Sequence, residues 1–151
     1  MQKLLNKVNQ LAAQIPNASI VNNAVSEASI GWHIEHSCLV IIKIAETIQQ
    51  SDAKNYHTQF NLRKYIVLLT GKFPRGRAKA PASVLPVNNS NLSELGQCIE
   101  HAKAAIQTLK STEKNKFFKH PIFGNLNVPK TIQFLAIHTQ HHLRIIEDIL
   151  K

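Results

Sequence analysis

Apolar residues recur every three or four positions along five stretches of the chain, which is the spacing of one face of an α-helix. Ser29, Gly71 and Pro129 support this reading, since they suit an N-cap, a helix stop and a first-turn position respectively. No segment alternates apolar and polar residues for long, so we expect no sheet of consequence. The pattern predicts helices over residues 2–15, 29–50, 59–70, 92–111 and 129–150.

The predicted helix over residues 29–50 is apolar on most faces, which places it at the centre of a bundle. The 151 residues fit one domain, spanning 1–151. We therefore predict an all-α, four-helix up-down-type bundle with long crossover loops. The connection over residues 72–91 contains three prolines, and a loop of that length is usually functional or mobile.

The formal net charge is +9, from 18 basic and 9 acidic residues. Such a surface attracts anions in general, but the sequence has no recognition-helix motif and no patch of interleaved basic and aromatic residues, so nucleic-acid binding ranks last. The longest apolar run, residues 39–44, is far shorter than the roughly 18 residues of a membrane span. Cys38 and Cys98 form no C-x-x-C motif, and two free thiols suit a reducing compartment, so we expect a cytoplasmic protein.

The strongest chemical signal is the clustering of histidines. Of eight in the chain, three lie between positions 138 and 142. Residues four apart share one face of a helix, so His138 and His142 can reach a common ion, and His141 ranks second. A third ligand from the helix over residues 29–50 would be His33 or His36. The alternative is a set of hydrogen-bonded core histidines.

Two motifs resemble the DinB/YfiT-like superfamily of bacterial four-helix bundles. One is Ser-Ile-Gly-Trp-His-Ile-Glu-His over residues 29–36, and the other is His-Thr-Gln-His-His-Leu-Arg over residues 138–144. The loop over residues 120–126 is similar to one in an uncharacterised subgroup. The family often has Trp directly before the Ser, whereas this chain has Ala28 there and Trp32 inside the helix. The resemblance implies a divalent metal held by His36, His138 and His142, with His33 and His141 as substitutes.

Three imidazole ligands with open positions are typical of a catalytic metal site. Imidazole suits several metals, and the resemblance favours Zn or Ni. It also implies a metal-dependent enzyme acting on a small molecule, as a thiol-dependent S-transferase using a low-molecular-weight thiol or as a hydrolase. Arg75 and Arg77 are candidates for binding an anionic thiol or substrate, unless they belong to a solvated loop. His120 is a candidate acid or base, unless it caps its loop.

Two other functions stay open. One is a non-catalytic metal-binding stress-response protein, which would use the same ligands. The other is a basic nucleic-acid-associated protein, whose affinity would fall steeply with salt. The apolar face of the first helix also leads us to expect a homodimer.

Overall fold

The computed structural model describes residues 1–73, 82–86 and 91–151. In these ranges the α-helices are α1 (Gln2–Ala12), α2 (Ile30–Gln50), α3 (Leu62–Thr70), α4 (Leu92–Lys110) and α5 (Val128–Ile149). The shorter elements are the 3-10 helices η1 (Ile15–Asn17), η2 (Ala53–Asn55) and η3 (Ala82–Val84), and the strands β1 (Phe117–His120) and β2 (Gly124–Asn127).

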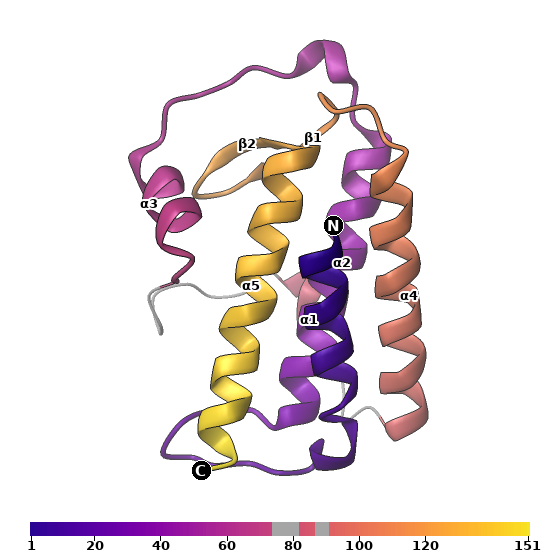
Figure 1. The fold of residues 1–151 in the computed structure, drawn as a ribbon, viewed down its shortest axis with the longest axis vertical. Helices are drawn as coiled ribbons and strands as arrows, with labels where there is room; N and C mark the ends of the chain where they lie inside the picture. Colours follow the sequence, from indigo (N-terminus) through magenta and orange to yellow (C-terminus); the bar gives the residue numbers. More distant parts are fainter. Residues whose placement is uncertain (74–81, 87–90) are drawn as a thin grey trace.

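Four of the helices form the bundle, and α3 lies outside it against α5 (Figure 1). Helix α2 packs against α4 and α5, and α1 packs against the same two helices from the other side. Helices α2 and α4 run in one direction while α1 and α5 run in the other (Figure 1). The parallel pair α2 and α4 requires the long crossover that carries α3. The predicted all-α bundle with a long crossover is confirmed.

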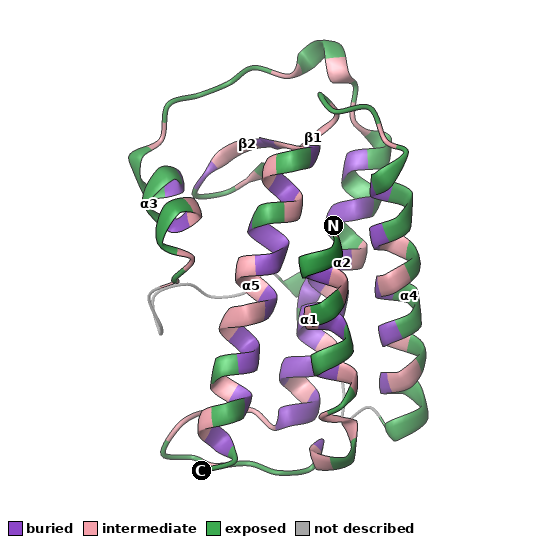
Figure 2. Cartoon of the chain, in the orientation of Figure 1, coloured by how far each residue is buried: buried purple, intermediate pink, exposed green. Residues whose placement is uncertain are grey.

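The core lies where the helices face one another, and exposed positions line their outer faces (Figure 2). Helix α1 contributes one stripe, with Leu4, Val8 and Leu11 fully buried. Helix α2 contributes most, as its apolar sequence predicts. Its buried apolar residues are Ile30, Ile34, Cys38, Val40, Ile41, Ile44, Ala45 and Ile48.

Several helix boundaries follow local sequence signals. The Ser29 hydroxyl accepts a hydrogen bond from the Trp32 amide at 3.2 Å, as expected of an N-cap. Gly71 ends α3 in the left-handed region, at φ +63°. Two predicted boundaries differ from the structure by more than one residue. Helix α1 stops at Ala12 rather than residue 15, and α3 begins at Leu62 because the Asn61 side chain caps it.

Between the predicted helices over residues 92–111 and 129–150 the chain forms a β-hairpin. Strands β1 and β2 pair antiparallel, from Phe117 opposite Asn127 to His120 opposite Gly124. Four-residue strands are too short to show a two-residue alternation in sequence. Gly124 lies at the turn with φ +68°, a conformation that favours glycine. The expectation of no sheet of consequence is confirmed, because the described ranges hold only this small two-stranded sheet.

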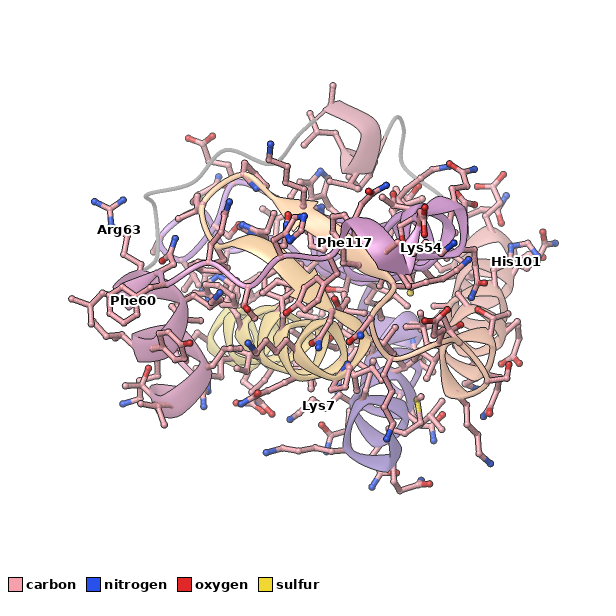
Figure 3. The ribbon with its side chains drawn as sticks, turned by 90° about the horizontal axis from the view of Figure 1, so that it is seen from above. Lys7, Lys54, Phe60, Arg63, His101 and Phe117 are labelled. Atoms are coloured by element: carbon pink, nitrogen blue, oxygen red, sulfur yellow. The ribbon has the colours of Figure 1, made fainter. Side chains whose placement is uncertain are left out.

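Hydrogen bonds tie the crossover to the bundle. The side-chain Nε2 of Gln133 on α5 donates to the Leu68 carbonyl at 2.9 Å, and the Asn61 side chain donates to the Ile122 carbonyl at 2.8 Å. Seen from above, Phe60 and Arg63 project outward at the edge of the molecule (Figure 3). In the described ranges, no helix combines the length and the apolar character needed to cross a membrane.

The two cysteines are distant in sequence but meet between α2 and α4. Their thiols are free and hydrogen-bond to one another. That hydrogen bond, together with burial, raises the pKa of Cys38 well above its usual value. The thiol pair is therefore part of the packing between these two helices.

The start of α2 is held by the chain segment that precedes it. The Gly31 amide donates to the Ala18 carbonyl at 2.8 Å, and the Ile30 amide donates to the Ile20 carbonyl at 3.0 Å. A Cβ at Gly31 would lie 3.1 Å from that carbonyl oxygen and 3.2 Å from the Ala18 Cβ. Glycine thus permits the close approach that anchors the first turn of α2.

This packing predicts opposite effects for two glycine-to-alanine variants. Gly96→Ala, inside α4, meets open space and should raise the free energy of unfolding by about 0.5–1 kcal/mol through helix propensity. Gly31→Ala gains the same propensity but overpacks against Ala18, and should lower that free energy by about 1 kcal/mol. Urea unfolding followed by circular dichroism measures both. Equal stabilisation by the two variants would contradict the close packing at Gly31.

Candidate metal centre

Helices α2 and α5 bring four histidines together from two distant parts of the sequence. His33 and His36 occupy the first two turns of α2, directly after the Ser29 cap. His138 and His142 lie one turn apart on α5, on the side that packs against α2. The spacing of four residues therefore places the side chains of His138 and His142 on one face of α5.

Three of these side chains form one group. Ligand nitrogens of His36, His138 and His142 all lie within 4.8 Å of one another. The ring centroids of the three pairs are 4.6–5.3 Å apart. Two zinc–nitrogen bonds of about 2.1 Å span at most about 4.2 Å, so small rotations of the rings would let them share an ion. Across the described residues, these histidines are the group that could hold a metal.

Hydrogen bonds at Nδ1 define how two of these histidines are oriented. His36 Nδ1 lies 2.7 Å from the carbonyl oxygen of Val84 in η3. A carbonyl can only accept, so Nδ1 carries the proton and Nε2 keeps its lone pair. His142 Nδ1 lies 3.0 Å from His33 Nδ1. In His36 Nε2 is thus the nitrogen available to an ion, and in His142 the direction of the hydrogen bond to His33 decides whether Nε2 carries a proton.

His138 is the exception. Its Nδ1 is buried and has no hydrogen-bond partner in the described part of the chain. An unsatisfied buried polar atom costs about 1–3 kcal/mol, and metal coordination at Nδ1 would remove that cost. This orphaned atom and the three imidazoles fit a divalent transition metal such as Zn or Ni.

The two substitute ligands lie beside the group rather than in it. His33 is buried, contacts His142, and has its Nε2 3.1 Å from the Ser26 hydroxyl. The ring of His141 lies 5.2 Å from that of His142 and 5.9 Å from that of Phe73.

Aromatic side chains surround the group. Trp32 stacks on His36, with centroids 4.9 Å apart and planes 14° from parallel. Phe73 meets His138 edge to face at 6.3 Å, and Phe134 lies 6.0 Å from the same ring. The spacing of four between Trp32 and His36 indicates the first of these contacts from the sequence, whereas the contact of Phe73 with His138 depends on the fold. The rings limit access of water to the imidazoles.

Burial keeps the imidazoles neutral. It is the main cause that lowers the pKa of His33 to about 4 and that of His36 below its usual value, although the Val84 carbonyl opposes the shift at His36. The pKa values of His138 and His142 lie well below the ordinary value, first through burial and then through neighbouring histidines. Neutral imidazole is the form that binds metals.

His120 lies at the end of β1, in the hairpin. Its Nδ1 accepts hydrogen bonds from the amides of Ile122 and Phe123, at 3.0 and 3.2 Å. Its ring stacks on Phe123 at 4.4 Å, and burial lowers its pKa to about 4. These bonds are those of a residue that caps its loop. Arg75 and Arg77, the candidates for binding an anion, lie outside the described residues.

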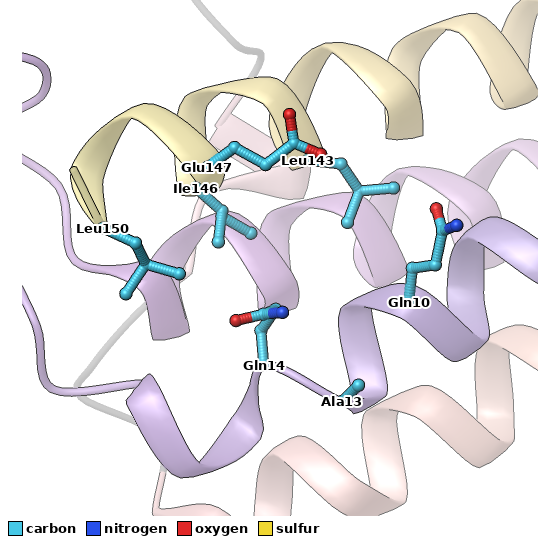
Figure 4. A pocket seen from close by; sticks show the side chains of 7 residues that line it. All are labelled: Gln10, Ala13, Gln14, Leu143, Ile146, Glu147 and Leu150. Atoms are coloured by element: carbon cyan, nitrogen blue, oxygen red, sulfur yellow. The ribbon is translucent and has the colours of Figure 1, made fainter.

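Two surface pockets lie away from the histidine group. One of about 250 Å³ lies between the end of α1 and α5, with Gln10 and Gln14 on one side and Leu143, Ile146 and Glu147 on the other (Figure 4). The other, of about 580 Å³, lies between α1, α3 and α5. Neither is lined by a histidine, so neither is part of the histidine group.

Metal sites of helical bundles are built from side chains on facing helices, and three imidazoles, two buried and one half-buried, meet here between α2 and α5. The family model described as the DinB superfamily matches residues 3–146. The chain therefore belongs to the DinB superfamily. No curated protein and no solved structure matches it.

The buried histidines predict how stability depends on pH. Without metal, the free energy of unfolding should fall as the pH drops from about 6.5 to about 4. In this window the unfolded chain binds protons at imidazoles such as His120, whereas the folded chain, with that pKa at about 4, does not.

The variant His120→Gln removes one such group. The slope of unfolding free energy against pH should become shallower by up to about 1.4 kcal/mol per pH unit. Urea unfolding at several pH values measures the slope, and His101→Gln, at an exposed position on α4, is the matched control. An unchanged slope in His120→Gln would show that burial does not displace the titration of this imidazole.

Proposed function

We propose that this protein binds one divalent metal ion, Zn or Ni, through His36, His138 and His142. The observation that carries the proposal is the meeting of these three imidazoles within 4.8 Å, one of them with a buried nitrogen that lacks a partner. Membership of the DinB superfamily supports it. The neutral state of the imidazoles supports it too, because no proton has to leave before a metal binds.

We further propose that the site is catalytic and acts on a small molecule, as a metal-dependent transferase or hydrolase. Structural zinc sites are usually closed by four protein ligands, whereas catalytic sites keep a position for water or substrate. Here the group has three members. Bound there, a divalent ion supplies Lewis acidity and lowers the pKa of a coordinated water or thiol.

The protein's own residues would prepare the site in two ways. His36 is oriented by its hydrogen bond to Val84, which directs the lone pair of Nε2 away from that carbonyl. Trp32 and Phe73 cover the imidazoles, which limits competing water. A low-molecular-weight thiol remains the cofactor that the family resemblance favours for a transferase.

Metal content tests the ligand assignment. The parent, supplied with Zn²⁺ or Ni²⁺ and then dialysed, should retain about one equivalent by plasma mass spectrometry. His36→Ala, His138→Ala and His142→Ala should each lose most of it, because two imidazoles hold an ion far less tightly than three. His101→Ala, an exposed histidine labelled at the periphery in Figure 3, should retain it.

Circular dichroism on each variant keeps a loss of metal separate from a loss of fold. A metal-free parent, or a folded His138→Ala that binds like the parent, would contradict the assignment.

Turnover separates an enzyme from a non-catalytic metal-binding protein. The metal-loaded parent should consume low-molecular-weight thiols in the presence of electrophiles, or hydrolyse activated esters and amides. His138→Ala should lose this activity with its metal, and His101→Ala should keep it. A parent that retains metal but turns over neither class of substrate would favour the non-catalytic alternative.

A further inference from the structure

His33 lies between a candidate metal ligand and a hydroxyl from the preceding loop. Its Nδ1 is 3.0 Å from His142 Nδ1, and its Nε2 is 3.1 Å from the Ser26 Oγ. The side chain is buried, with 4% of its surface exposed. Both ring nitrogens of His33 are therefore engaged, and the three side chains form one continuous line of hydrogen bonds.

This line can run in two directions when both imidazoles are neutral. In the first, His142 Nδ1–H donates to His33 Nδ1, and His33 Nε2–H donates to the Ser26 Oγ. In the second, the Ser26 hydroxyl donates to His33 Nε2, and His33 Nδ1–H donates to His142 Nδ1. Each direction places one proton between each pair of atoms, so both satisfy the distances.

Only the first direction prepares His142 for an ion. There His142 carries its proton on Nδ1, and the lone pair of Nε2 is free. In the second direction the His142 proton is on Nε2, which then cannot coordinate. The direction of the line thus decides whether the third imidazole of the proposed site is a ligand.

We propose that His33 is a positioning residue that, together with Ser26, fixes His142 in the tautomer that binds metal. The inference rests on the proposed metal-binding function. It assigns His33 a role outside the ligand set, as the acceptor for His142 Nδ1–H. Partners of this kind orient metal-bound histidines in general, and their loss typically weakens metal affinity about 10–100-fold.

The loop before α2 is built to hold Ser26 in place. The amides of Val25 and Ser26 both donate to the Asn22 carbonyl, at 2.8 and 2.9 Å, and the Asn22 side chain accepts from the Ala24 amide. The Ser26 Oγ also accepts from the Ala28 amide at 3.2 Å. A hydroxyl oxygen has two lone pairs, so one remains to accept from His33 Nε2–H, as the first direction requires.

Two amide replacements of His33 distinguish this role from packing. In His33→Asn the side-chain oxygen occupies about the position of Nδ1 and can accept from His142. In His33→Gln the amide group lies about where Nε2 was, one bond too far from His142. Glutamine fills more of the volume of the ring, so a role in packing alone would make it the better substitute.

The measurement is the Zn²⁺ dissociation constant of each metal-free variant, by competition with a chromophoric chelator at neutral pH. His33→Asn should bind Zn²⁺ at least about tenfold more tightly than His33→Gln does. His101→Asn is the control for histidine loss at an exposed position and should match the parent. Equal affinities of the two His33 variants, or tighter binding by His33→Gln, would overturn the inference.

Ser26→Ala provides a second test that holds if a His33 variant fails to fold. Removing the acceptor for His33 Nε2–H should weaken Zn²⁺ binding about two- to tenfold, the worth of one neutral hydrogen bond. If Ser26→Ala bound Zn²⁺ as tightly as the parent, Ser26 would have no role in the line of hydrogen bonds, and that part of the inference would be overturned. A parent that binds no Zn²⁺ would overturn the proposed function itself. If the parent binds Zn²⁺ and these variants bind it equally well, only the role of His33 and Ser26 is overturned.

Discussion

Imidazole rings packed inside a bundle must find a partner for each ring nitrogen, because a buried polar atom left without one costs about 1–3 kcal/mol. Much of the structure around the cluster follows from this requirement. The Val84 carbonyl of η3 accepts a hydrogen bond from His36. His142 is hydrogen-bonded to His33, which is in turn hydrogen-bonded to the Ser26 hydroxyl. In the described part of the chain the Nδ1 of His138 has no hydrogen-bond partner, and His138 is one of the three histidines that could hold a single ion.

The same requirement links distant parts of the fold to the cluster. Helix α2 starts where it does because Ser29 caps it and because Gly31 allows the segment around Ala18 to approach. The position of this first turn along the bundle axis determines where His33 and His36 lie relative to His138 on α5. The crossover after α2 returns as η3 to contact α2 and supply the Val84 carbonyl. Segments outside the bundle core thus complete the surroundings of the imidazoles.

The bundle and half of the site were accessible from the sequence. Helical periodicity found each long helix, and the spacing of four between His138 and His142 indicated a shared face. His36 and His33 could not be separated by pattern, and the family resemblance favoured His36. Their different surroundings depend on contacts 48 and 109 positions away in the chain, with Val84 and His142. No local pattern encodes such contacts.

The elements that the sequence did not predict have a similar explanation. The hairpin over Phe117–Asn127 has strands too short for periodicity, and its stability comes from pairing and from the burial of Phe123 and Leu126. The sequence leaves His120 as either a candidate acid or base or a residue that caps its loop, and its Nδ1 accepts hydrogen bonds from two backbone amides. In such short elements, hydrogen-bond partners rather than residue types define the role of a side chain.

The most direct test of the central claim is a titration of the metal-free protein with Co²⁺, followed by visible absorption. Co²⁺ reports its own coordination, because four- and five-coordinate ions absorb far more strongly than the six-coordinate aqueous ion. If the three histidines bind one ion, the titration should saturate at one equivalent with the strong bands of a four- or five-coordinate, nitrogen-ligated ion. A spectrum that stays that of aqueous Co²⁺ throughout would contradict this claim, and would leave the buried histidines as part of the core.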